Sequence, residues 1–276
     1  MASSTKASKV VFGNLKGGVG KTVCTGQAAH AAVVLGHRVL IVDADPQGNI
    51  TRAFTNFDTV NMPPASLADV LDRRASATIH DAIQPTRREG ISILPSGFDE
   101  LQAVQDALIS QPGAENSLAK ALREVDQDFD FIFIDSRPAT DLITRAAFMA
   151  ADRMIVVIQP EDWAIRGLQM TLSAVEDLKE YLDKDLPVAG WIINLVNPSR
   201  NDHAENLEQL KAMAAAENVP ILGEPIPSTA DLGRLSVVGM GADEHPKPTP
   251  RIRNFASMFL SIVESLSTST QNGVHA

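Results

Sequence analysis

The sequence predicts an α/β fold, a mostly parallel twisted sheet with helices on both faces. Two observations support this prediction. Short apolar runs such as residues 38–42 and 129–135 have the length and continuous hydrophobicity of strands that are buried on both faces of a parallel sheet. Segments with apolar residues at helical spacing, such as residues 163–182, alternate with these runs along the chain. Such alternation is typical of strands joined by right-handed helical crossovers.

Helices and strands are expected in the following order along the chain. Gly36 stands where a C-cap ends the first helix, and Asn197-Pro198 ends the last strand. The expected strands are residues 9–14, 38–42, 90–96, 129–135, 153–159 and 188–195. The expected helices are residues 21–35, 66–74, 79–82, 99–109, 117–125, 142–150, 163–182, 202–217 and 251–266. We expect a single domain over residues 9–266, a disordered lead-in over 1–8, a loop over 239–250 and a polar tail over 267–276.

Composition narrows the class of protein. The 276 residues are 44% hydrophobic, which is ample for a core, yet no apolar run approaches the roughly 18 residues of a membrane span. The one cysteine, Cys24, excludes an intrachain disulfide framework and a cysteine-cluster metal site, and we expect it to be buried. We therefore expect a cytoplasmic protein with no membrane attachment. The net charge of −10 argues against general affinity for nucleic acid but leaves room for one basic face.

Residues 10–22 hold the strongest motif. An apolar strand runs into a glycine-rich turn that closes on Gly-Lys-Thr before a helical pattern, the order of a phosphate-binding loop. Glycines let backbone N–H groups surround an oxyanion at a helix N-terminus. Lys21 is expected to reach the β- and γ-phosphates, and the Thr22 hydroxyl to ligate Mg²⁺. The expected nucleotide-binding residues here are Gly17, Gly18, Val19, Gly20, Lys21, Thr22 and Val23.

Three aspartates follow predicted strands. Asp43 and Asp45 come directly after one apolar run, and Asp135 ends another in the manner of a Walker B motif. Carboxylates at that edge of a parallel sheet suit the shell of Mg²⁺, which we assign to Asp43 and Asp135, or the orientation of an attacking water. The simpler readings are a turn capped by Asp and Pro at residues 43–49, and a cap on the helix after Asp135.

These motifs resemble the ParA/MinD family of P-loop ATPases, whose deviant loop reads K-G-G-x-G-K-[ST]. The resemblance covers residues 9–266 and rests mainly on residues 16–22 and 43–49. It implies an ATP-dependent homodimer with two ATP·Mg²⁺ between the subunits and slow, partner-stimulated hydrolysis. Lys16 matches the signature lysine that reaches the partner's nucleotide, and Asp45 matches the aspartate tied to hydrolysis, so Lys16, Lys21 and Asp45 are the expected catalytic residues. Arg137 stands where the family has a proline, which leaves the geometry of that loop open.

Within the family the chain looks most like the short ParA-type plasmid or chromosome partition proteins. The tail has no amphipathic membrane helix, and one cysteine cannot hold an iron–sulfur cluster. The resemblance implies non-specific DNA binding in the ATP state, a ParB-like adaptor protein and, if DNA is bound, association with the nucleoid. It places Pro227 and Ser228 near the adenine. Candidate DNA contacts, which can equally be a solvated face, are Arg200, Arg234, Lys247, Arg251 and Arg253.

Two other functions remain open at this point. One is a ParA-like ATPase that positions or assembles a protein complex without binding DNA. The other is a metabolic ATP-dependent amidase or synthetase with a related loop, which predicts a substrate pocket that the sequence does not identify. Trp163 and Met170 are expected to pack in the core or in an interface rather than to contact a cofactor.

Overall fold

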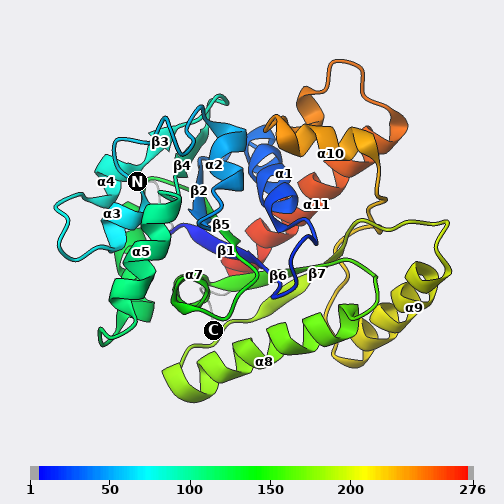
Figure 1. Ribbon diagram of the computed structural model, residues 1–276. Helices are drawn as coiled ribbons and strands as arrows, with labels where there is room; N and C mark the ends of the chain where they lie inside the picture. Colours follow the sequence, from blue (N-terminus) through cyan, green and yellow to red (C-terminus); the bar gives the residue numbers. More distant parts are fainter. Residues whose placement is uncertain (1–5, 273–276) are drawn as a thin grey trace.

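A seven-stranded sheet forms the centre of the computed structural model, which describes residues 6–272 (Figure 1). The strand order is β3-β4-β2-β5-β1-β6-β7, and every neighbouring pair is parallel except β3 and β4. The strands are β1 (Ser8–Gly13), β2 (Val39–Ala44), β3 (Gln84–Pro85), β4 (Ile91–Leu94), β5 (Phe131–Ser136), β6 (Arg153–Ile158) and β7 (Val188–Ile193). The predicted fold class, a mostly parallel sheet between helices, is confirmed.

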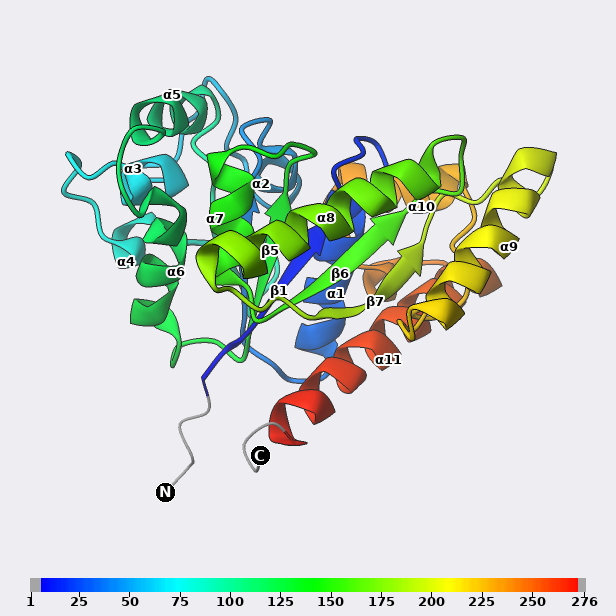
Figure 2. The same ribbon diagram turned by 90° about the horizontal axis from the view of Figure 1, so that it is seen from below.

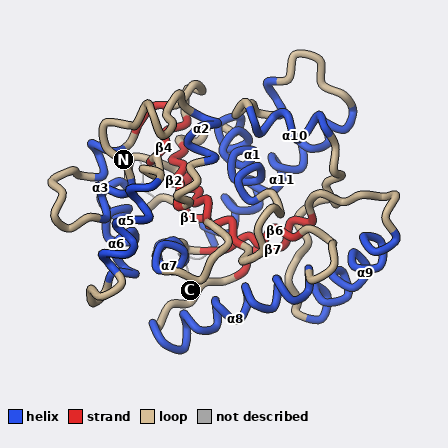
Figure 3. The backbone as a smooth tube through the Cα atoms, viewed as in Figure 1, coloured by secondary structure: helices blue, strands red, loops and turns tan. Residues whose placement is uncertain are grey.

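Helices surround the strands on both sides, as the coloured tube of Figure 3 shows. The α-helices are α1 (Lys21–Val34), α2 (Asn49–Phe54), α3 (Leu67–Leu71), α4 (Ile79–Ala82), α5 (Asp99–Leu108), α6 (Ser117–Leu122), α7 (Leu142–Ala150), α8 (Ala164–Leu182), α9 (Asn201–Ala216), α10 (Ala230–Val237) and α11 (Pro250–Asn272). Short 3₁₀ turns are η1 (Ala114–Asn116), η2 (Arg123–Val125) and η3 (Ala242–Glu244). No helix within residues 6–272 is long and apolar enough to cross a membrane.

The side chains of each central strand alternate between two apolar cores. On β1, Val10 and Phe12 point into the core beneath α1, α10 and α11, whereas Val11 points into the core shared by α3, α5, α6, α7 and α8. All six residues of β1 are buried, as the continuous apolar run predicts. Figure 1 shows α1 and α11 on one face of the sheet and α7 and α8 on the other, and Figure 2, seen from below, shows α8 in front of the strands.

Several boundaries differ from expectation. Ser8 is the first residue of β1 and is buried, so it belongs to the sheet rather than to a lead-in; residues 1–5 lie outside the described part. Helix α11 continues to Asn272, so the expected tail is helical as far as that residue, and residues 273–276 lie outside the described part. The short strand β3, helix α10 and turn η3 were not expected.

Trp163 and Met170 are both exposed at the surface. Trp163 is 70% exposed and Met170 is 50% exposed, so the prediction that they pack in the core of this chain is wrong. Cys24 is buried, as expected.

Since parallel strands end at the same edge of a sheet, the segments after β1, β2, β5, β6 and β7 meet there, and they carry the site.

Candidate functional site

Two glycines shape the loop between β1 and α1. Gly18 has φ 77°, and Gly20, the N-cap of α1, has φ 92°, both in the left-handed region that favours glycine. Asn194, directly after β7, fastens the loop because its Nδ2 donates to the carbonyl of Val19 at 2.9 Å. A Cβ on Gly20 would lie 2.1 Å from that Nδ2, so a larger residue does not fit. The loop leads straight into a helix N-terminus, the geometry that binds phosphate.

Lys21 is buried at the inner side of this loop. Its Nζ donates to the carbonyl of Asn14 at 3.0 Å and to that of Lys16 at 3.3 Å. Burial lowers the pKa of Lys21, while the nearby charges of Asp135 and Asp45 act to raise it. The Lys21 Nζ is thus held by two loop carbonyls near Asp135 and Asp45, where a phosphate would complete its set of acceptors.

Asp43 and Asp135 lie opposite each other on the neighbouring strands β2 and β5. Both are buried, and burial is the main cause that raises the pKa of Asp43 to about 7 and that of Asp135 to about 8. The Asp43 carboxylate accepts from Thr51 N at 3.0 Å, Thr51 Oγ1 at 2.6 Å and Asp45 N at 3.2 Å. It therefore holds the start of α2 and the Asp45 turn in place.

The other carboxylate has free capacity. Asp135 Oδ1 is buried and has no hydrogen-bond partner among the described residues, and the carboxylate accepts a hydrogen bond from the Thr22 hydroxyl. An unpartnered buried carboxylate oxygen beside a hydroxyl and a second carboxylate suits a hard, oxygen-seeking cation. The donor set of Asp135 and Thr22, with Asp43 behind it, fits Mg²⁺.

Asp45 lies in the turn between β2 and α2. Its Oδ1 accepts from Gln47 N at 2.9 Å, its carbonyl accepts from Gly48 N at 2.9 Å, and its side chain is half-buried. It faces a cleft of about 430 Å³ beside the glycine-rich loop. The cleft is lined by Gly18, Gly20, Lys21, Thr22, Asp45, Gln47, Asn49, Ser136, Arg137 and Pro138. The cleft thus joins the glycine-rich loop, the Asp45 turn and the segment directly after Asp135.

Lys16 points to a different part of the surface. Its Nζ lies 3.2 Å from Glu161 Oε2, and Glu161 also accepts from Gln159 Nε2 at 2.7 Å and lies 3.8 Å from Arg200 Nη1. Lys16, Glu161 and Arg200 line a second hollow of about 650 Å³ together with the exposed Trp163. The two lysines of the loop therefore lie apart: Lys21 lines the cleft, whereas Lys16 lines the second hollow.

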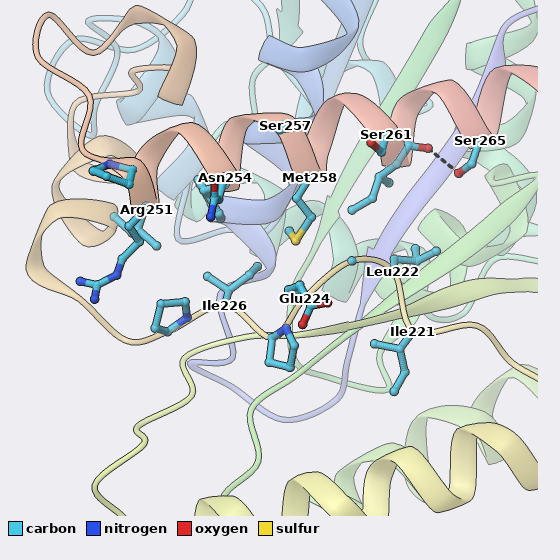
Figure 4. Close-up of a pocket in the computed structure, with 17 residues that line it drawn as sticks. Ile221, Leu222, Glu224, Ile226, Arg251, Asn254, Ser257, Met258, Ser261 and Ser265 are labelled. Atoms are coloured by element: carbon cyan, nitrogen blue, oxygen red, sulfur yellow. Dashed lines mark hydrogen bonds between the residues drawn. The ribbon is translucent and has the colours of Figure 1, made fainter.

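The segment expected to lie near the base follows the outer side of β7. Ile226 N donates to Ile193 O and Ser228 N donates to Val196 O, each at 2.8 Å. Pro227 lines an open groove of about 850 Å³ between this segment and α11, whose wall carries Arg251, Asn254 and Met258 (Figure 4). Since Asn194 joins the same end of β7 to the phosphate loop, the segment lies near the loop; its contact with adenine stays a prediction.

The expected DNA contacts fall into two places. Arg234, Lys247, Arg251 and Arg253 are all exposed on α10, the following loop and the first turn of α11. Arg200 lies elsewhere, because it precedes α9 and pairs with Asp202 and Glu161 beside Lys16.

Sequence reasoning missed two polar residues of the site. Asn194 holds the phosphate loop, and Glu161 holds Lys16. Glu161 comes two residues after the predicted strand 153–159, and Asn194 lies at the end of the predicted strand 188–195. A polar residue at the carboxyl end of a strand is the same signal that selects Asp43 and Asp135. Applied to every strand of the sheet, that rule would have found them.

Comparisons with known proteins identify the family. A family model described as an AAA domain, AAA_31, matches residues 7–188, more than half of the chain. The chromosome-partitioning ATPase Soj of Thermus thermophilus is 28% identical over 89% of this chain and 91% of its own length. A crystal structure of cobyrinic acid a,c-diamide synthase from Mycobacterium smegmatis, with a bound ATP analogue and magnesium, is 30% identical, with a TM-score of 0.72 over 84% of this chain and 91% of that one.

A third similarity concerns the fold alone. The Cyanothece McdA–ATP complex has a TM-score of 0.82 over 95% of this chain and 97% of that one, at 22% identity. Together, the sheet order, the glycine-rich loop and these matches define a P-loop ATPase that uses ATP and Mg²⁺. The chain belongs to the AAA_31 family and is an ATPase of the ParA/MinD type, as the deviant loop indicates.

Proposed function

We propose that this ATPase is a dimeric switch for plasmid or chromosome partition. ATP closes two subunits on each other, the dimer binds DNA without sequence preference, and a ParB-like adaptor stimulates hydrolysis and release. The proposal includes action in the cytoplasm, on the nucleoid while DNA is bound. The similarity to a chromosome-partitioning ATPase over most of both chains supports this choice within the family.

In this proposal each site residue has one task. Lys21 and the amides of residues 17–23 hold the phosphates, while Thr22 and Asp135 hold Mg²⁺, which supplies charge neutralisation on the phosphate oxygens when it is bound. Asp43 fixes the turn that carries Asp45. Asp45 orients the attacking water, because its half-buried carboxylate opens on the cleft.

The position of Lys16 is the observation that supports an ATP-dependent dimer. The Lys16 ammonium lies outside its own cleft, in the second hollow, which the exposed Trp163 also lines. A cation placed there can meet the nucleotide of a second subunit that packs against this face, where it would add charge to the γ-phosphate region.

The observation that favours DNA is the set of exposed cations over residues 234–253. In a chain of net charge −10 they supply the local positive charge that phosphate contacts need. Four such residues per subunit become eight in a dimer, which favours binding by the dimer over binding by the monomer.

A DNA retention assay tests the proposal. The protein is mixed with duplex DNA of unrelated sequences and no nucleotide, ADP or ATP, at two salt concentrations, with Asp45→Ala in ATP as a further sample. We expect retention only with ATP, loss at the higher salt, and persistence in Asp45→Ala because hydrolysis is blocked. If ATP forms the dimer and no state retains DNA, the protein acts through a protein complex instead.

Variants of the basic residues sharpen the assay. Arg251→Ala and Arg253→Ala are each expected to weaken retention equally on all sequences and to reduce the salt slope by about 1. Arg74→Ala is the matched control, because Arg74 is an exposed arginine that pairs with Asp72 near α3, at the opposite edge of the sheet. Retention that is unchanged in the first two variants would remove this face from the proposal.

An amide-forming enzyme is the second candidate, and the name of the Mycobacterium smegmatis structure favours it. Such an enzyme would make ADP in proportion to an amidated product, whereas a switch makes ADP without any acceptor. Phosphate release by the purified protein with ATP, Mg²⁺ and DNA alone therefore separates the two.

A further inference from the structure

Arg137 brings a second fixed cation to the wall of the phosphate cleft. It follows Ser136, the last residue of β5, whose Oγ donates to the carbonyl of Phe12 at 2.9 Å and so ties this corner to β1. Pro138 packs over Gly17, where an added Cβ would lie 3.6 Å from the proline ring. Arg137 is thus held between two anchored residues, and with Lys21 it is one of two cationic residues that line the 430 Å³ cleft.

The guanidinium is held by one nitrogen. Arg137 Nη1 donates to Gln102 Oε1 at 2.8 Å and lies 3.0 Å from Asp141 Oδ2. Among the described residues no hydrogen bond involves Nε or Nη2 of Arg137. The side chain is 25% exposed, and Arg137 lines the cleft.

The two partners of the Arg137 guanidinium, Asp141 and Gln102, are themselves held in place. Asp141 is the N-cap of α7, where its Oδ1 accepts from Thr144 N at 3.1 Å. Gln102 lies on α5. An arginine that is oriented by two helices before a ligand arrives loses little side-chain entropy on binding it.

We propose that Arg137 binds the terminal phosphate of the ATP held by its own subunit, through its Nε–Nη2 edge. The planar fork of that edge matches two oxygens of a phosphate. The γ-phosphate is present in ATP and absent in ADP, so this contact makes the site discriminate between them. During hydrolysis water forms the new bond to the γ-phosphorus, the bond to the ADP oxygen breaks, and Arg137 stabilises charge on the γ-oxygens.

This inference depends on the ATPase activity and is independent of DNA binding and partition. It also gives Asp141 a positioning task. Because Asp141 caps α7 and pairs with Arg137, binding of the γ-phosphate is sensed at the start of α7.

The test compares the affinities for ATPγS and ADP, both with Mg²⁺, in Arg137→Gln and Arg137→Lys. Loss of a charge-assisted contact to the γ-phosphate is expected to weaken ATPγS about tenfold in Arg137→Gln and to change ADP less than about twofold. Arg137→Lys keeps the charge without the fork and should lie between Arg137→Gln and the parent protein.

Two controls separate this contact from a structural role. Arg145→Gln removes an exposed arginine of α7 whose guanidinium donates to the Thr140 carbonyl, and it should leave both affinities unchanged. Asp141→Asn keeps a good N-cap but removes the charge that holds Nη1, so it should weaken ATPγS less than Arg137→Gln does.

Three outcomes would overturn the proposal. Equal losses for ATPγS and ADP in Arg137→Gln would mean that the side chain only joins α5 to α7. No loss for either ligand would mean that it has no role in binding. A loss confined to the dimeric species would place the guanidinium on the partner's nucleotide.

Discussion

Lys16 Nζ lies 3.2 Å from Glu161 Oε2, which joins the phosphate loop to the segment after β6. The two residues are 145 positions apart in the sequence, and both side chains are partly exposed, at 24% and 33%. An ion pair of that exposure is worth at most about 1 kcal/mol. It is therefore strong enough to direct Lys16 and weak enough to be exchanged for a nucleotide phosphate.

Glu161→Gln should make Lys16 more available to a second subunit. We expect ATP to produce the dimer at a concentration about threefold lower than in the parent protein, because the competing charge is gone. Sedimentation over an ATP titration measures this shift. Glu176→Gln, an exposed change in α8, the helix that follows Glu161, is the control. Weaker dimerisation in Glu161→Gln would show that Glu161 supports the closed dimer instead.

Asp45→Ala should separate ATP binding from hydrolysis. Phosphate release is expected to fall about 100-fold or more because the group that orients the water is lost, whereas ATPγS affinity should stay within about twofold. Asp58→Ala is a suitable control, since Asp58 accepts from Val60 N and Asn61 N in a turn that does not line the cleft. Parallel loss of binding and hydrolysis would contradict the assigned task.

Gly48→Ala should destabilise the protein more than Gly36→Ala. Both glycines have positive φ, 63° and 86°. A Cβ on Gly48 would lie 2.2 Å from the ring of Phe98, whereas a Cβ on Gly36 meets nothing within 4 Å. The expected loss is about 3 kcal/mol for Gly48→Ala, from backbone strain and overpacking, and about 1 kcal/mol for Gly36→Ala, from strain alone. Equal shifts of the urea midpoint would be inconsistent with this packing.

A buried histidine connects α1 to the loop before α11. His30 Nδ1 lies 2.9 Å from Arg88 Nη1, and His30 Nε2 lies 3.2 Å from the Gly239 carbonyl. Because arginine only donates, Nδ1 accepts and Nε2–H donates. Burial first, and then the charge of Arg88, lowers the pKa of His30 to about 4, although Glu244 and Asp243 act to raise it. At pH values between the folded and the unfolded pKa, His30 is therefore neutral in the folded protein and protonated in the unfolded chain.

This pKa predicts how stability depends on pH. Between about pH 6.5 and pH 4 the unfolded chain binds a proton at His30 that the folded protein does not, so the free energy of unfolding falls as the pH falls, by up to about 3 kcal/mol from this group. His30→Gln should remove most of that slope, and His80→Gln, at an exposed position, should leave it unchanged. Urea unfolding at pH 7 and pH 4.5 measures the difference.

The parts of the site that could be predicted are those that follow apolar strands directly. The loop after β1, Asp43 and Asp135 are each preceded by a continuous apolar run, and parallel strands bring them to one edge. Contacts such as Lys16 with Glu161 and Arg137 with Gln102 join residues far apart in the chain, so no local sequence pattern predicts these contacts.

Helix α10 was missed for a physical reason. It is eight residues long and contains Gly233, which is a poor helix former. Its buried Leu232 and Leu235 pack into the core beneath α1 and α11, so tertiary contacts stabilise a helix that local propensity does not. In α11 the first part of the helix packs in the same core, and the helix continues into a Ser/Thr-rich end that by itself reads as a polar tail.

The most direct test of an ATP-dependent dimer is the mass of the Asp45→Ala variant in solution, measured by sedimentation with ATP and with ADP. We predict a dimer with ATP, a monomer with ADP, and a monomer in both when Lys16→Ala is added to Asp45→Ala. A monomer in every nucleotide state, or a dimer that forms equally well without Lys16, would contradict the proposal that ATP switches this protein by joining two subunits.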